Sequence, residues 1–146
     1  MIIKIIGIGI IIIAFNLMIQ GLGNVFLLRN ITAATKHQTN MTNAKILKVL
    51  LFSVILFTVI HLAHALVWAF CYYIIPETAS QFASFSEATY FSLVTFTTLG
   101  YGDISLSSEW RLLSGLEAIN GIMLIGWSTA MMYSLIQNLY KKINAT

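Results

Sequence analysis

Three long apolar runs, at residues 2–28, 46–75 and 111–139, constrain this chain more than any other feature of its sequence. An α-helix needs about 20 apolar residues to cross the hydrocarbon core of a bilayer, and each run is long enough. Of the 146 residues, 58% are hydrophobic and only 9% are charged, which is far from the composition of ordinary soluble domains. The sequence therefore predicts an all-α membrane protein with three transmembrane helices, surrounded by membrane lipid.

The first run has an alternative interpretation, because a cleaved signal peptide also combines an early positive charge with an apolar segment. In this chain the charged start is only Lys4, the apolar run is long for a signal peptide, and no convincing small-residue cleavage site closes it. We therefore expect residues 1–28 to form a retained N-terminal transmembrane helix.

Basic residues mark the side of the membrane on which the loops lie. The predicted linker at 29–45 and its edge are basic and contain no acid (Arg29, Lys36, Lys45, Lys48). The C-terminal segment adds Lys141 and Lys142, so the positive-inside rule places both segments in the cytoplasm and the N-terminus outside. We expect a multi-pass protein of the cell membrane, plasma or inner. The 8 basic residues form no clustered patch, so no nucleic-acid partner is predicted.

The segment between the second and third runs is unusual. Pro76 should end the second helix at about Ile75. Ser84 and Glu87 have the spacing of a capping box, in which Ser84 bonds the amide of Glu87 and Glu87 returns to the amide of Ser84. The helix that they begin, residues 85–97, is apolar but too short to span a bilayer. It suits a re-entrant helix that is shielded by other protein.

Residues 95–103 read Thr-Phe-Thr-Thr-Leu-Gly-Tyr-Gly-Asp and directly follow this short helix. The segment resembles the potassium-channel pore family through its T-x-G-Y-G-D signature and the paired threonines Thr97 and Thr98. A lone Gly-Tyr-Gly would be a weak signal, but here it lies between two predicted spanning helices. With Trp110-Arg111 and 126–130, the resemblance covers roughly residues 46–140 and extends to small bacterial channels that have an extra N-terminal helix.

The resemblance implies a potassium-channel pore fold that assembles as a homotetramer around one central pore. One chain carries one pore loop, so four chains are needed to close the ring. The implied pore domain, 46–140, divides into an outer helix at 46–75, a re-entrant pore helix at 85–97, a selectivity-filter loop at 98–103 and an inner helix at 111–139.

The resemblance further implies that the filter consists of Thr98, Leu99, Gly100, Tyr101 and Gly102. The carbonyls of Thr98 through Tyr101 and the hydroxyl of Thr98 would bind potassium in place of its water shell. Successive carbonyls can face one axis only if the backbone alternates between right- and left-handed dihedrals, which Gly100 and Gly102 adopt without a Cβ clash. Leu99 stands where the family usually has Val, which should alter packing behind the filter more than selectivity.

Three residues around the filter are expected to support it: Thr97, Asp103 and Tyr90. Some family members carry a glutamate at the position of Val94 that supports the carboxylate after the filter, so here Asp103 lacks that partner. Tyr90 lies one helical turn from Val94 and is the candidate donor to Asp103. Alternatively, Asp103 is a solvated acid that only raises the local cation concentration. Tyr101 is expected to brace the filter against aromatics such as Tyr90.

Gly121 aligns with the family's hinge in the inner helix if one residue is missing between Trp110 and Arg111. A gating hinge is one interpretation, and close helix packing through a small residue is the other. No regular series of Arg or Lys marks a voltage sensor, so the gating stimulus stays open.

Several polar residues lie inside the predicted spans. Asn16, Gln20 and Asn24 recur every four residues and should face protein. His61, His64 and Glu117 are expected to serve in packing through interhelical hydrogen bonds or in pH sensing. A metal site built on the two histidines is the weaker alternative.

The sequence thus predicts a potassium-selective channel subunit that mediates passive transport, with potassium as permeant ion, no cofactor and no enzymatic activity. Two alternatives within channels are a less selective cation channel and an accessory subunit of a hetero-tetramer. A membrane redox or metal protein is a further alternative, but it would leave the T-x-G-Y-G-D segment unexplained.

Overall fold

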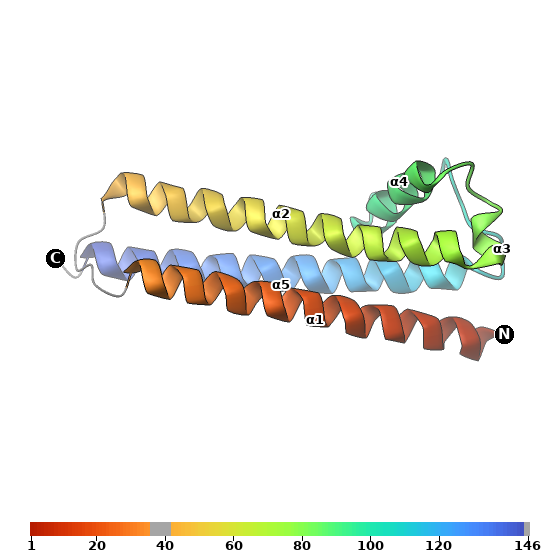
Figure 1. Cartoon of the computed structure of the whole chain (residues 1–146), viewed down its shortest axis with the longest axis horizontal. Helices are drawn as coiled ribbons and strands as arrows, with labels where there is room; N and C mark the ends of the chain where they lie inside the picture. The colour runs from red at the N-terminus through yellow and green to blue at the C-terminus, as the bar shows by residue number, and fades with distance from the viewer. Residues whose placement is uncertain (36–41, 145–146) are drawn as a thin grey trace.

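The computed structural model describes residues 1–35 and 42–144, and every regular element in these residues is a helix (Figure 1). In chain order the helices are α1 (Ile2–Thr35), α2 (Asn43–Ile74), α3 (Pro76–Ala79), α4 (Phe85–Phe96) and α5 (Arg111–Asn144). The segments long and apolar enough to cross a membrane are Ile2–Ile31, Asn43–Ile74 and Arg111–Lys141. The predicted all-α class, with three helices able to span a membrane among the described residues, is confirmed.

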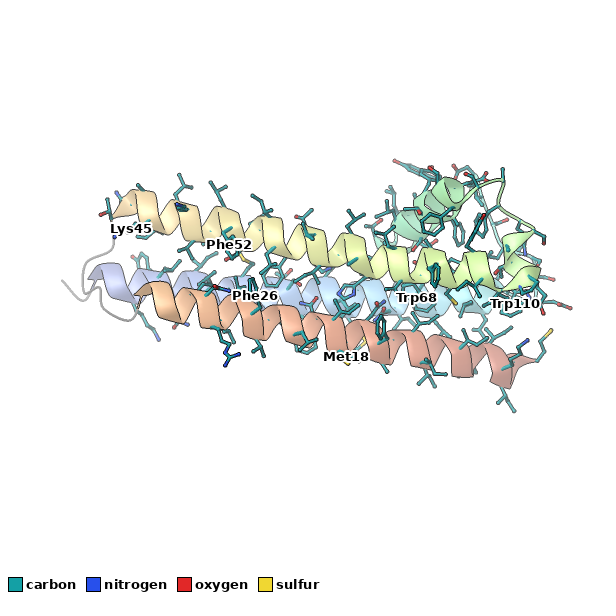
Figure 2. The ribbon with its side chains drawn as sticks, in the orientation of Figure 1. Met18, Phe26, Lys45, Phe52, Trp68 and Trp110 are labelled. Atoms are coloured by element: carbon teal, nitrogen blue, oxygen red, sulfur yellow. The ribbon has the colours of Figure 1, made fainter. Side chains whose placement is uncertain are left out.

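Helices α1, α2 and α5 run side by side along the whole length of the molecule, while α3 and α4 lie at one end of it (Figure 1). The N-terminus lies at the end that carries α3 and α4, and the C-terminus lies at the other. Figure 2 places Trp110 and Lys45 at these opposite ends. An ion pair between Lys4 Nζ and Glu77 Oε1, at 4.0 Å, joins the start of α1 to α3.

The long helices extend beyond the predicted apolar runs, α1 and α5 at their C-terminal ends and α2 at its N-terminal end. Helix α1 continues to Thr35 because no Gly or Pro interrupts residues 29–35, and Asn30 Nδ2 donates to the carbonyl of Phe26 at 2.9 Å. Helix α2 already begins at Asn43. The predicted linker at 29–45 is therefore partly helical, and Lys36, which it includes, lies outside the described residues.

The end of α2 follows from Pro76. Ile75 adopts an extended conformation (φ −73°, ψ 115°), as the residue before a proline favours, and α2 ends at Ile74. Pro76 then occupies the first turn of α3, where its missing N–H costs nothing. The sequence did not predict this short helix. Thr78 Oγ1 donates to the carbonyl of Tyr72 at 2.7 Å and thereby ties α3 to the end of α2.

The start of α4 is capped by Ser84, whose Oγ accepts from the amide of Glu87 at 3.2 Å, as predicted. The reciprocal bond differs from the prediction: the Glu87 carboxylate accepts from the amide of Ala83 and not from that of Ser84. Both arrangements satisfy an amide ahead of the helix, and here the bonded amide lies one residue earlier in the chain.

The core that holds α4 in place is aromatic. The rings of Tyr72 and Phe91 meet edge to face with centroids 5.3 Å apart, and Phe82 lies 5.4 Å from Phe91. Trp68, Tyr72 and Phe96 are almost completely buried. Edge-to-face pairs of this kind add specific geometry to the burial of large apolar surface, so they fix the orientation of α4 against α2.

Large apolar side chains nevertheless cover the outward faces of the long helices (Figure 2). Among them are Phe15, Phe52, Phe70, Trp127 and Tyr133, each at least 40% exposed. Contiguous exposed apolar surface of this extent is incompatible with water and requires lipid or another protein surface.

Candidate functional site

The segment between α4 and α5 has an alternating backbone. Thr98, Gly100 and Gly102 adopt left-handed conformations, with φ of 59°, 55° and 77°. Among the described residues no other residue has positive φ. Alternation between left- and right-handed residues turns successive carbonyls toward the same side of the chain.

Thr98 is the residue that the sequence did not single out for this role. A β-branched side chain in the left-handed region is a genuine outlier, since its Cβ crowds the following carbonyl oxygen. Such strain costs about 1–3 kcal/mol, is retained only where surrounding structure imposes it, and clusters at functional sites. No sequence signal for this conformation exists, because threonine is not a residue that favours it.

Two backbone amides of residues 98–102 are hydrogen-bonded to α4. The N–H groups of Leu99 and Gly100 both donate to the carbonyl of Val94, at 2.9 and 3.2 Å. The carbonyls of residues 98–101, in contrast, accept no hydrogen bond found within residues 1–35 and 42–144, and these residues are exposed. The amides of Leu99 and Gly100 are thus bonded to α4, whereas the carbonyl oxygens of residues 98–101 are available to another partner.

The hydrogen bond predicted between Tyr90 and Asp103 is present: Tyr90 Oη donates to Asp103 Oδ2 at 2.8 Å. This bond to a carboxylate raises the pKa of Tyr90 above its ordinary value, because it stabilises the neutral tyrosine. It links α4 to Asp103, the last residue of the T-x-G-Y-G-D signature. Thr97 is folded back on α4, where its hydroxyl donates to the carbonyl of Leu93 at 2.7 Å.

Tyr101 does not pack against Tyr90 within its own chain. Its side chain is 66% exposed, and no ring pair among the described residues joins it to Tyr90. The left-handed glycines that flank it leave its side chain outside the packed core of the chain. A cavity of about 250 Å³ lies behind the segment, lined by Phe91, Val94 and Gly102 among others, and Tyr101 is not part of its lining.

Gly121 lies against the C-terminal end of α4. A Cβ atom built on Gly121 would lie 1.8 Å from the carbonyl oxygen of Phe96, so only glycine fits between the two helices. Helix α5 runs without interruption from Arg111 to Asn144 through this position. The structure therefore supplies a packing reason for Gly121 that is independent of any hinge.

The predicted polar stripe of α1 does face protein. Asn16, Gln20 and Asn24 are all buried. Asn16 Nδ2 donates to Asn120 Oδ1 at 2.9 Å, and Gln20 Nε2 donates to Ser128 Oγ at 3.0 Å. The stripe thus connects α1 to α5 of the same chain.

Two further groups extend this network to α2. Trp68 Nε1 donates to Asn120 Oδ1 at 3.0 Å, so Asn120 accepts from both neighbouring helices. His64 Nε2 donates to Gln20 Oε1 at 3.2 Å. Sequence reasoning found the stripe but not Trp68, Asn120 or Ser128 as its partners, because contacts between helices far apart in the chain leave no local pattern.

The two histidines lie against the C-terminal end of α4. Their ring centroids lie 6.0 Å apart, and each ring lies 6.0 Å from that of Phe96. In the part of the chain that the structure describes, no three His, Cys, Asp or Glu side chains come together as a metal-binding group. His64 serves an interhelical hydrogen bond, as expected for packing.

Glu117, on α5, bonds side chains of both α2 and α4. It is completely buried. Tyr72 Oη lies 2.6 Å from Glu117 Oε2, and Ser92 Oγ makes a short hydrogen bond with Glu117 Oε1. The sequence identified Glu117 as a candidate but gave no indication of Tyr72 or Ser92 as its partners.

Comparison with known proteins gives one match. A family model described as "Ion channel" matches residues 58–138, which is more than half of the chain. The match includes most of α2, all of α4 and the signature segment, and most of α5. Searches among curated proteins and among solved structures found no match.

Proposed function

Because this chain belongs to the ion-channel family, as a pore domain of the potassium-channel type, we propose that it is one subunit of a potassium-selective channel. Potassium would cross the membrane passively, through a filter formed by residues 98–102. The proposed ligands are the backbone carbonyls of Thr98, Leu99, Gly100 and Tyr101, together with the Thr98 hydroxyl.

The main support for this proposal is the backbone of residues 98–102, in which every second residue has a positive φ. Its left-handed residues, Thr98, Gly100 and Gly102, turn successive carbonyls to one side, and these carbonyls accept no hydrogen bond within the described residues. Free carbonyl oxygens in a membrane protein need a partner. A dehydrated potassium ion is such a partner, since a ring of carbonyl oxygens replaces its water shell.

Helix α4 suits the role of a re-entrant pore helix. Its 12 residues extend about 18 Å, which is too short to cross about 30 Å of hydrocarbon. Its buried face packs on the aromatic core against α2, and its C-terminal end leads directly into the signature segment. The partial negative charge of a helix C-terminus would favour a cation beneath the filter.

A single chain supplies only one side of a carbonyl ring. We therefore propose a homotetramer with cyclic symmetry, in which each subunit contributes one signature segment. The exposed side chains of Leu99 and Tyr101 and the apolar outer faces of α5 support this assembly, because they need a covering surface. Helix α1 packs on α2 and α5 of its own chain, so we place it at the periphery of the tetramer.

The orientation follows from charge. Arg29, Lys45, Lys48 and Lys141 lie exposed at the end of the bundle away from α4. We propose that this end faces the cytoplasm of a cell membrane, plasma or inner, and that α4 and the filter lie in the outer half.

The test is potassium and sodium flux into liposomes that contain the purified protein. A Gly100→Ala, Gly102→Ala variant places two Cβ atoms at positive φ and should abolish barium-sensitive potassium flux. The matched control is Gly115→Ala, Gly126→Ala, because these glycines have no positive φ and no atom within 4 Å of an added Cβ. The control should conduct like the wild type.

Other outcomes separate the alternatives. Equal sodium and potassium flux in the wild type would indicate a less selective cation channel. A protein that neither conducts nor cross-links to a tetramer when expressed alone would indicate an accessory subunit of a hetero-tetramer.

A further inference from the structure

The pocket around Glu117 contains four oxygen-bearing groups from three helices. Tyr72 and the Ala65 carbonyl belong to α2, Ser92 to α4 and Glu117 to α5, and all four residues have no exposed surface. Ser92 Oγ lies 2.7 Å from Ala65 O and also bonds Glu117 Oε1, while Tyr72 Oη bonds Glu117 Oε2 at 2.6 Å. Each contact requires one proton between its two oxygens.

The number of available protons determines which group donates in each of these three hydrogen bonds. A backbone carbonyl can only accept, so the single hydroxyl proton of Ser92 must be donated to Ala65 O. That proton is then not available for Glu117, and the Ser92–Glu117 bond needs a proton from the carboxyl group itself. Tyr72 donates its own proton to the remaining carboxyl oxygen. Only a protonated Glu117 completes all three hydrogen bonds.

The surroundings give a second, independent argument. The one ion pair among the described residues joins Lys4 to Glu77, so no cationic side chain neutralises Glu117. The titratable neighbours on α2, Tyr72 and Cys71, are neutral in their ordinary states, and the group of α4 that bonds Glu117 is the hydroxyl of Ser92. A buried carboxylate without a cation is strongly disfavoured, whereas a neutral, fully bonded carboxylic acid is not.

We propose that Glu117 is a protonated positioning residue that fixes α4 between α2 and α5 and so holds the filter in its conducting geometry. Ser92 lies two residues before Val94, whose carbonyl accepts from the amides of Leu99 and Gly100. Glu117 therefore reaches the filter through α4 without touching an ion. One turn further along α5, Gly121 lies directly against the carbonyl oxygen of Phe96. Helix α5 therefore contacts α4 at two positions, through Glu117 and through Gly121.

The inference rests on the proposed channel function for its effect on conduction, but not for the protonation state. Infrared spectra of the purified full-length protein at neutral pH test protonation directly. A wild-type minus Glu117→Gln difference spectrum should contain the carbonyl-stretch band of a protonated carboxylic acid. Absence of this band, or a carboxylate band in its place, overturns the proposal whether or not the protein conducts.

The flux assay tests the positioning role. In Glu117→Gln the amide donates to Ser92 and its oxygen accepts from Tyr72, so the ratio of potassium to sodium flux should stay within about twofold of wild type. Glu117→Leu leaves Tyr72 without its acceptor and removes the bond between Glu117 and Ser92, although Ser92 still donates to Ala65 O, and should lower this ratio by about tenfold.

Two further outcomes are decisive. Loss of selectivity in a folded Glu117→Gln protein would mean that a charge, rather than a proton donor, is needed, and unchanged selectivity in Glu117→Leu would remove the positioning role. If the wild type itself fails to conduct, the proposed function fails, while the infrared band still decides the state of Glu117.

Discussion

Gly121 and Phe96 approach so closely that a methyl group on Gly121 would lie 1.8 Å from the Phe96 carbonyl oxygen. The clashing atom belongs to the backbone at the end of α4, so a change of side-chain rotamer cannot relieve the clash. Helices α5 and α4 are therefore in direct backbone contact at the C-terminal end of α4.

The first prediction is that Gly121→Ala destabilises the assembled protein by about 1–3 kcal/mol, because overpacking against backbone outweighs the gain in helix propensity. The melting midpoint of the purified protein measures this. Gly126→Ala in the same helix meets no atom within 4 Å and should leave the midpoint unchanged or raise it. Equal behaviour of the two variants would contradict the contact.

The second prediction concerns the titration of Tyr90. Its hydrogen bond to Asp103 raises its pKa above 10.0. The stabilisation is therefore complete below pH 10 and is lost as the pH rises through the raised pKa. In a difference titration, wild type minus Tyr90→Phe, tyrosinate absorbance should have its midpoint above pH 10. Asp103→Asn should move that midpoint down, and an unmoved midpoint would show that the bond does not form.

A third prediction addresses the network between α1 and the other helices. Asn120→Leu leaves the buried donors of Asn16 and Trp68 without their acceptor and should destabilise the protein by about 1–2 kcal/mol. Asn138→Leu is the matched control, since Asn138 is an exposed residue of the same helix. If both substitutions lower the melting midpoint equally, the interhelical bonds contribute nothing specific.

The fourth prediction separates stability from selectivity at Thr98. Thr98→Gly relieves a left-handed β-branched residue and should stabilise the protein by up to about 1 kcal/mol, after the entropy cost of glycine is subtracted. It also removes a proposed potassium ligand, so the potassium to sodium flux ratio should fall. Thr97→Gly, at a right-handed residue, should lower stability. A Thr98→Gly protein that melts below wild type would contradict the assigned strain.

Local rules made much of the fold predictable. The lengths of the apolar runs gave three spans, Pro76 gave the end of α2, and the spacing of Ser84 and Glu87 gave the start of α4. Each of these signals acts through hydrogen bonds or sterics within a few residues, which a sequence displays directly. The continuation of α1 to Thr35 was missed because the helix was expected to end with its apolar run. The polar residues that follow contain no Gly or Pro and stay helical.

Contacts between distant segments were not predictable. The partners of Glu117 lie 25 and 45 residues before it, and no periodicity connects them. Gly121 had two interpretations because a hinge and a close contact both require glycine, and only the position of Phe96 O shows the contact. The Tyr90–Asp103 bond was predictable from the resemblance, because Tyr90 lies one helical turn from Val94, where some family members carry the glutamate that supports this carboxylate. The roles assigned to these residues stay predictions until flux is measured.

The parallel run of the three long helices has a mechanical consequence. The segments able to cross a membrane contain 30, 32 and 31 residues, or about 45–48 Å each, so each is long enough for a hydrocarbon layer of about 30 Å and continues beyond it. Because the three helices pack side by side, one helix cannot adjust alone to a change in bilayer thickness: the bundle tilts as a unit, or the bilayer adjusts around it. The thickness of the host membrane therefore acts on α1, α2 and α5 together.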